Sequence, residues 1–256
     1  MPNFRFLRVF NDPALAGHAG SKTRIGWNTL PYFPSERLSD RFVRELAADR
    51  ALPIKEIVEA FEFFAVARKY IRTSVVADVC SGHGLLGVLF LMMQPEVEQV
   101  VLCDRRKPDG FQRVLGAALR IAPWVEERIR YVQAPLESAA DHVPEGSGVV
   151  AVHACGFLTD RSFELAAKIG GPFACLPCCR DHSESKAPLG LRHALGEDVA
   201  FDVHRTYVME ERGYRVRWRE IPVEITPMNR VLIATPRPSP DPSSNDAPKT
   251  AVGSAP

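Results

Sequence analysis

The amino-acid sequence predicts an α/β fold, a Rossmann-like and mostly parallel sheet with an antiparallel C-terminal hairpin and a helical N-terminal extension. From residue 74 onward, short apolar runs alternate with stretches of helical periodicity, and this alternation is typical of a parallel sheet. Near the end, residues 214–221 alternate apolar and polar positions, and a second apolar run follows at 229–234. Two such runs in close succession indicate antiparallel strands that close the sheet.

The elements of this sheet can be placed from the hydrophobic pattern. We expect the parallel strands at residues 75–80, 97–104, 128–133, 148–153 and 172–177. The helices between them are expected from the end of the glycine-rich segment at Gly87 to Met93, and at residues 108–121 and 159–169.

Two further parts flank this Rossmann-like domain, which we place at residues 71–235. Residues 1–70 are expected to form an extension with two helices, the first capped by Ser39 and the second running from Pro53 to about Tyr70. Residues 236–256 are rich in Pro, Ser, Asp and Ala, a composition that predicts a disordered tail.

Composition narrows the class of protein. With 256 residues, 46% hydrophobic residues and a formal net charge of +1, the chain has no overall attraction to nucleic acid or membrane. Its six cysteines are too few for a secreted disulfide scaffold, so we expect reduced thiols in a cytoplasmic protein. The start of the chain lacks the apolar core of a signal peptide. The longest apolar run, Leu85 to Met93, is about half the roughly 20 residues that a bilayer needs, so no membrane contact is expected. The oligomeric state stays open.

A glycine-rich loop follows the first predicted strand. The segment Gly82-His-Gly-Leu-Leu-Gly87 matches the G-x-G-x-x-G pattern and opens a helix, the context that makes this pattern credible for a nucleotide-like cofactor. Its glycines permit a tight turn and a close approach of ligand to backbone. Asp104 ends the next strand, where the hydroxyls of a ribose would be bound. The alternative is a plain strand-to-helix turn without a ligand.

The carboxylate just ahead of this loop bears on which cofactor is bound. Asp78 lies within the apolar first strand, and a buried carboxylate is costly unless it is paired or hydrogen-bonded. It could support the loop or hold the positively charged amino acid half of S-adenosylmethionine. No partner for a pyrophosphate is evident near the loop. We therefore favour S-adenosylmethionine over NAD.

Groups that do chemistry also follow the fourth and fifth strands. His153 could accept a proton from a hydroxyl or an amine, or could simply be hydrogen-bonded at a strand end. Asp160 could orient this segment, although ordinary helix N-terminal chemistry is slightly favoured. Cys178 and Cys179 could act as nucleophile, metal ligands or packing groups. A tetrahedral zinc on these two thiols, His153 and Cys155 is the less favoured hypothesis, because adjacent cysteines tend to point apart.

Two weaker features have a structural and a functional interpretation. Arg215, Arg217 and Arg219 share one face of a late strand, and with the basic residues 105–107 they could contact phosphates. We prefer the solvated face of a charged edge strand. The aromatic cluster at residues 61–64 is expected to be core packing and not a base-stacking platform.

These motifs together resemble a known group of methyltransferase domains. The segments Asp78–Gly84, His153–Asp160, Pro177–Arg180 and Ile225–Arg230 are similar to the domain found in methyltransferase-like 25 proteins and in the glutathione S-transferase C-terminal-domain-containing protein. They are more distantly similar to tRNA 2′-O-methyltransferases with a Cys-Cys-His-His signature. The resemblance spans about Ile71 to Ala234, and it implies the fold and the cofactor. Position 80 is Cys where many methyltransferases have Gly, and Arg180-Asp-His182 departs from His-His, so the resemblance does not fix the acceptor.

The sequence thus predicts an S-adenosylmethionine-dependent methyltransferase of unknown acceptor, with RNA (tRNA or rRNA) or protein considered. An NAD(P)-linked oxidoreductase and a catalytically inactive binding module are the alternatives. The predicted catalytic residues are His153, Asp160, Cys178 and Cys179, and no metal is expected. The predicted cofactor contacts are Asp78, Cys80, Ser81, Gly82, His83, Gly84, Gly87, Asp104, Arg105, Gln133, Ala154 and Cys155.

Overall fold

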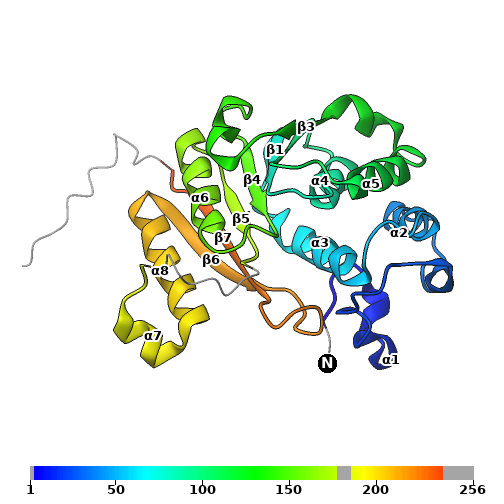
Figure 1. Ribbon diagram of the computed structural model, residues 1–256, viewed down its shortest axis with the longest axis horizontal. Coiled ribbons are helices and arrows are strands. Elements are labelled where there is room, and N and C mark those ends of the chain that lie inside the picture. Colours follow the sequence, from blue (N-terminus) through cyan, green and yellow to red (C-terminus); the bar gives the residue numbers. More distant parts are fainter. Residues whose placement is uncertain (1–2, 178–185, 239–256) are drawn as a thin grey trace, which may run out of the picture.

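The computed structural model describes residues 3–177 and 186–238, which form a layered α/β structure around one sheet (Figure 1). The strand order is β3-β2-β1-β4-β5-β7-β6. The first five strands are parallel, and β7 runs antiparallel to both β5 and β6. The strands are β1 (Val75–Val79), β2 (Gln99–Asp104), β3 (Ile129–Gln133), β4 (Gly148–Ala151), β5 (Phe173–Cys175), β6 (Tyr214–Glu220) and β7 (Arg230–Pro236).

The expected sheet is therefore confirmed, with differences at some strand ends. The predicted fourth strand stops at Ala151, so His153 lies in the following loop and not in the strand. The C-terminal hairpin inserts β7 between β5 and β6, which leaves β6 at the edge of the sheet. The predicted tail boundary at residue 236 is wrong by a short stretch. Pro236 still belongs to β7, and the Arg237 N–H donates to the carbonyl of Gly213 at 2.8 Å. Residues 239–256 lie outside the described chain.

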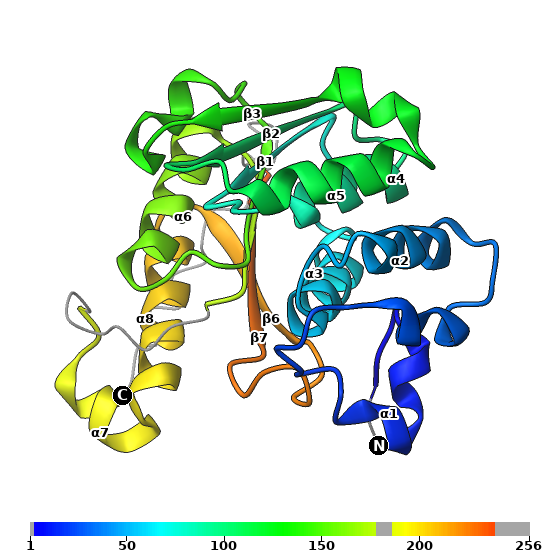
Figure 2. The ribbon, with the colours of Figure 1, turned by 45° about the vertical axis from the view of Figure 1, so that its right-hand side comes forward.

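Helices cover both faces of the sheet (Figure 2). Strand side chains alternate between two hydrophobic clusters, because successive residues of a strand point to opposite faces. One cluster joins the sheet to α2, α3, α4 and α5, and the other joins it to α6 and α8. These helices are α2 (Leu38–Ala48), α3 (Ile54–Ala67), α4 (Leu85–Met93), α5 (Asp109–Leu119), α6 (Phe157–Ile169) and α8 (Glu197–Glu211).

Shorter helical segments complete the described chain. The sequence did not predict α7 and α8 between β5 and β6, and α6 begins at Phe157, before the expected Thr159. None of the helices in the described ranges is long and apolar enough to cross a bilayer. The short segments are α1 (Pro13–Ala16), α7 (Leu189–Leu195) and the 3-10 helices η1 (Arg8–Asn11), η2 (Trp27–Tyr32), η3 (Pro123–Arg128) and η4 (Leu136–Asp141).

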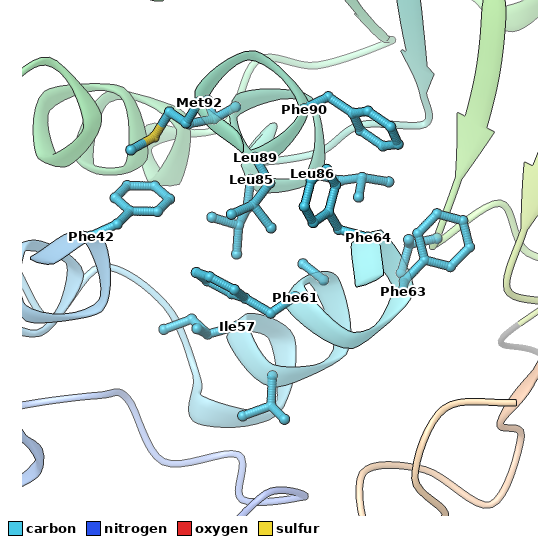
Figure 3. Packing of buried hydrophobic residues seen from close by; sticks show 14 of the residues in the cluster. Phe42, Ile57, Phe61, Phe63, Phe64, Leu85, Leu86, Leu89, Phe90 and Met92 are labelled. Carbon is cyan, nitrogen blue, oxygen red and sulfur yellow. The ribbon is translucent and has the colours of Figure 1, made fainter. Parts of the chain in front are cut away.

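The N-terminal extension shares its core with the sheet domain (Figure 3). Phe64 of α3 meets Phe90 of α4 edge to face, with ring centroids 5.0 Å apart. The buried carboxylate of Glu62 accepts hydrogen bonds from the backbone N–H groups of residues 5–7, at 2.8–3.0 Å, and so fixes the start of the chain against α3. Because one core spans both parts, the domain boundary at residue 70 stays a prediction. The cap prediction is wrong: α2 begins at Leu38, so Ser39 lies inside the helix.

Candidate functional site

The glycine-rich loop lies at the carboxyl end of β1, and the backbone is left-handed at three positions in or just before the loop. Cys80, Gly82 and Gly84 have φ values of 52°, 50° and 69°. A left-handed residue with a side chain costs about 1–2 kcal/mol, so Cys80 is strained at the position where many methyltransferases have Gly. A Cβ on Gly87 would lie 2.5 Å from Leu102 Cδ2, so this glycine lets α4 approach β2.

Asp78 is buried beneath the loop. The residue is 3% exposed, and its Oδ2 accepts a hydrogen bond from the Gly87 N–H at 3.0 Å. Burial raises the pKa of this carboxyl to about 8, because the hydrogen bond from Gly87 offsets only part of the lost hydration. The carboxyl lines a small hollow together with Cys80, Ser81 and His153. A cationic group bound in this hollow would compensate the charge of Asp78.

Asp104, at the end of β2, holds the other side of the loop. Its Oδ2 accepts from the Gly82 N–H at 2.9 Å, and Oδ1 accepts from the Arg106 N–H at 3.2 Å. Each carboxylate oxygen retains a further lone pair for a hydroxyl donor. The Tyr131 hydroxyl lies 2.8 Å from the carbonyl oxygen of Gly82 and packs its ring against Phe111. The sequence did not single out Tyr131, because its role follows from the pairing of β3 with β2 and not from a motif.

The helix α3 of the N-terminal extension forms one wall of the hollow. Glu56 and His83 are joined at 2.8 Å, between Oε2 and Nε2. This hydrogen bond is the chief reason that the pKa of Glu56 is lowered. The His83 Nδ1 faces the Leu85 N–H at 3.4 Å, so both ring nitrogens have partners. Sequence reasoning missed the α3 glutamates, although acidic residues at 56, 59 and 62 on an otherwise apolar helix were a usable signal.

His153 lies in the loop after β4 and lines the same hollow. Its Nε2 is 3.9 Å from Oε2 of Glu59, and its side chain is 40% exposed. Loss of hydration lowers the pKa of His153, while the Glu59 carboxylate acts in the opposite direction. The imidazole is therefore neutral at pH 7 and able to accept a proton.

The other predicted cofactor contacts lie around this centre. Ser81 is buried, and its hydroxyl has no hydrogen-bond partner among the residues that the structure describes. Ala154 is buried and Cys155 half-buried just after His153. Arg105 and Gln133 are exposed at the carboxyl ends of β2 and β3. Their contacts with a cofactor stay predictions.

Asp160 is engaged in a different place. It lies in the first turn of α6 and pairs with Arg205 of α8 at 2.8 Å, and Arg205 also donates to the carbonyl of Gly156 at 3.2 Å. The residues that line the hollow at Asp78 and His153 do not include Asp160. This carboxylate therefore ties α8 to the start of α6, and its catalytic role stays a prediction.

The cysteine predictions fall partly outside the described residues. Cys178 and Cys179 lie outside the described residues, as does the segment 180–182 that differs from the His-His signature. Cys175 is buried in β5, and burial raises the pKa of its thiol. Burial likewise raises the pKa of Cys80 to about 12, so this thiol is protonated at pH 7. Across residues 3–177 and 186–238, no three Cys, His, Asp or Glu side chains gather as a metal site.

The two groups of basic residues are far apart. Arg217 and Arg219 stack on the ring of Tyr70, at 5.5 and 5.6 Å from its centroid, on the edge strand β6. Residues 105–107 follow β2, which is five strand spacings away, or about 24 Å. The single phosphate patch considered from the sequence is thus not formed. The aromatic residues 61, 63 and 64 are fully buried core, as expected.

Comparisons with known proteins give a shared fold and distant relatives. No protein-family model matches the chain. The human glutathione S-transferase C-terminal domain-containing protein is 27% identical over 155 residues, which are 60% of this chain and 22% of that protein. The Xenopus laevis protein of the same description is 31% identical over 169 residues, which are 66% of this chain and 25% of that protein. The chain thus spans about a quarter or less of the curated relatives that it matches.

Among solved structures, a Corynebacterium glutamicum protein aligns with a TM-score of 0.51 at 15% identity, covering 84% of this chain and 97% of that one. The M. capricolum TrmK complex with S-adenosyl-homocysteine aligns with a TM-score of 0.44 at 10% identity, covering 68% of this chain and 66% of that one. The likeness to the Corynebacterium glutamicum protein concerns the fold alone. With the strand order, it confirms the Rossmann-like fold expected from the sequence.

Proposed function

We propose that this chain is an S-adenosylmethionine-dependent methyltransferase. The observation that carries the proposal is the buried carboxyl of Asp78, which lines a hollow beside the glycine-rich loop and has a backbone N–H as its hydrogen-bond partner. When bound, this cofactor supplies an electrophilic methyl group on a positively charged sulfur. Its ammonium group would compensate the charge of Asp78, and its ribose hydroxyls fit the remaining lone pairs of Asp104.

The same residues argue against a dinucleotide. A pyrophosphate needs free backbone N–H groups at the glycine-rich loop and the start of the helix. Here the Gly82 N–H donates to Asp104 and the Gly87 N–H donates to Asp78. Both donors are thus already engaged by carboxyl groups, so neither is free to bind a pyrophosphate. A cationic cofactor without phosphates fits this arrangement.

The methyl acceptor is proposed more broadly. The resemblance of the sequence motifs to tRNA 2′-O-methyltransferases favours RNA, and protein is the other class considered. A neutral His153 at the rim suits an acceptor that must lose a proton, such as a hydroxyl or an amine. A module that binds the cofactor without turnover is the alternative.

The first experiment is thermal unfolding with S-adenosylmethionine, S-adenosylhomocysteine, NAD or NADP added separately. A ligand at a hundred times its dissociation constant stabilises the folded chain by about 2.7 kcal/mol, which raises the melting temperature by several degrees. A rise with the two adenosyl compounds alone supports the proposal. A rise in melting temperature with NAD or NADP, or no rise with any of the four compounds, contradicts the proposal.

A second experiment separates turnover from binding. The chain is incubated with S-adenosylmethionine carrying a labelled methyl group and with total RNA or total protein. Label that nuclease removes identifies an RNA acceptor, and label that protease removes identifies a protein acceptor. Binding without label in either fraction favours the inactive module.

A further inference from the structure

Two glutamates on α3 each face a histidine of the candidate site. Glu56 pairs with His83 of the glycine-rich loop, and Glu59 faces His153 after β4. We propose that Glu59 is a positioning residue: it holds the Nε2–H of His153, so that Nδ1 is left to accept the proton of the methyl acceptor. This inference rests on the proposed function and assigns the N-terminal extension a part in the reaction.

Glu59 is suited to fix a neighbouring ring because its own position is fixed. Its side chain is 1% exposed, and both carboxylate oxygens lie 2.9 Å from Lys55 Nζ, one turn earlier on α3. A buried carboxylate is costly without a partner, and Lys55 offsets that cost. The carboxylate therefore has a defined orientation toward the loop that carries His153.

The contact between Glu59 and His153 is not closed in this structure. The distance of 3.9 Å from Oε2 to Nε2 is longer than a hydrogen bond, and the His153 side chain is 40% exposed. Catalytic hydrogen bonds are often long without ligand and shorten in the substrate complex. A shift of about 1 Å at the ring would bring the Nε2–H within hydrogen-bond distance of Glu59.

The two glutamate–histidine pairs differ in whether a histidine nitrogen is left available as an acceptor. Both nitrogens of His83 have partners, Glu56 at Nε2 and the Leu85 N–H at Nδ1, so this histidine supports the loop. In His153, Nε2 faces Glu59, and no hydrogen bond to Nδ1 comes from the described part of the chain. A neutral imidazole has one donor and one acceptor nitrogen. His153 is thus the member of the two pairs with an acceptor nitrogen available.

The reaction then needs only one proton transfer at the protein. A lone pair of the acceptor oxygen or nitrogen forms the bond to the methyl carbon, the carbon–sulfur bond breaks with its electron pair going to sulfur, and the acceptor proton moves to Nδ1. His153 becomes positively charged, and the Glu59 carboxylate on the far side of the ring stabilises that charge. Solvent later removes the proton.

The test is nitrogen-15 NMR of the histidine side chains in the full chain without acceptor. In the wild type we expect the Nε2–H tautomer of neutral His153. We expect Glu59→Gln to lower the pKa of His153 by about one unit, because a carboxylate within about 4 Å favours the charged ring. Glu56, Lys55 and His83 are the other charged or titratable groups that act on this ring. The matched control Glu56→Gln removes a carboxylate that pairs elsewhere, so its effect on His153 should be clearly smaller.

The experiment distinguishes a failure of the inference on Glu59 from a failure of the proposed function. An Nδ1–H tautomer in the wild type, or a His153 pKa that Glu59→Gln leaves unchanged, overturns the inference. If Glu59→Gln does not fold, the tautomer of the wild type decides. The thermal shift with S-adenosylmethionine is measured on the same samples, and we expect Glu59→Gln to keep it. Absence of that thermal shift in the wild type refutes the proposed function, whatever the tautomer and pKa of His153.

Discussion

The Asp78 carboxyl and the Gly87 N–H are 3.0 Å apart, and this hydrogen bond ties the end of β1 to the first turn of α4. The amide is one of those at the start of a helix that have no partner within it, and the partial positive charge there favours an anion. It does not suffice for Asp78, whose pKa remains near 8. The first strand and its helix thus hold an acid that a bound cation would ionise.

The first prediction concerns ligand affinity and pH. If S-adenosylmethionine binds the ionised form of Asp78, its affinity should rise about tenfold from pH 6 to pH 7, because the ionised fraction grows tenfold per unit below a pKa near 8. Isothermal titration calorimetry measures this directly. Asp78→Asn should bind weakly, with little dependence on pH in this range. An equally steep rise in the variant would show that another group is responsible.

The second prediction is the effect of the same group on stability without ligand. The folded pKa is near 8 and the unfolded value is near 3.8, so the folded state retains the proton between these values. Its contribution to the free energy of unfolding is complete below about pH 4 and is lost as pH rises toward 8, by up to about 1.4 kcal/mol per unit. Urea unfolding of the wild type and Asp78→Asn at pH 5 to 8 isolates the contribution of Asp78. If the free energy of unfolding depended on pH equally in both proteins, this prediction would be contradicted.

The fold was largely predictable from local pattern, and the site only partly so. Continuous apolar runs such as Val75–Val79 mark buried parallel strands, and Gly82 to Gly87 mark the turn that follows. The helix α8 was missed because its hydrophobic residues do not form a clear stripe. Glu59 and Tyr131 belong to the site through the packing of α3 and the pairing of β3, and no short motif carries either relationship.

The third prediction tests the close approach of α4 to β2. In Gly87→Ala the new Cβ would lie 2.5 Å from Leu102 Cδ2 and 2.8 Å from Val100 Cγ1, so the helix or the strand must shift. We expect a loss of about 1–3 kcal/mol in the free energy of unfolding, together with weaker ligand binding. Gly116→Ala in α5 is the matched control. Its nearest neighbour is an Arg120 nitrogen at 3.8 Å, so it should be neutral or stabilising. Similar losses in both variants would exclude this packing argument.

The fourth prediction concerns the shared core. Phe64 is fully buried between Phe6 and Phe90, and thus joins the N-terminal extension to α4. Phe64→Ala should lower the free energy of unfolding by about 3–5 kcal/mol in a single cooperative transition. Tyr207→Ala, at a site that is 65% exposed, should change it by less than about 0.5 kcal/mol. Two separate denaturation transitions, with only the first affected by Phe64→Ala, would instead show that the extension is an independent domain.

The fifth prediction separates the two roles considered for Asp160. Its pairing with Arg205 at 2.8 Å holds α8 against the start of α6, and Arg205 is only 14% exposed. Asp160→Asn should therefore lower the free energy of unfolding by about 1 kcal/mol and leave the thermal shift with S-adenosylmethionine unchanged. Glu164→Gln, which disrupts the exposed pair with Arg161 on the same helix, should cost less than about 0.5 kcal/mol. Once an acceptor is known, methyl transfer by Asp160→Asn decides the matter. A loss of turnover with stability intact would restore Asp160 as a catalytic residue, whereas a loss of stability with turnover intact leaves it as the link between the two helices.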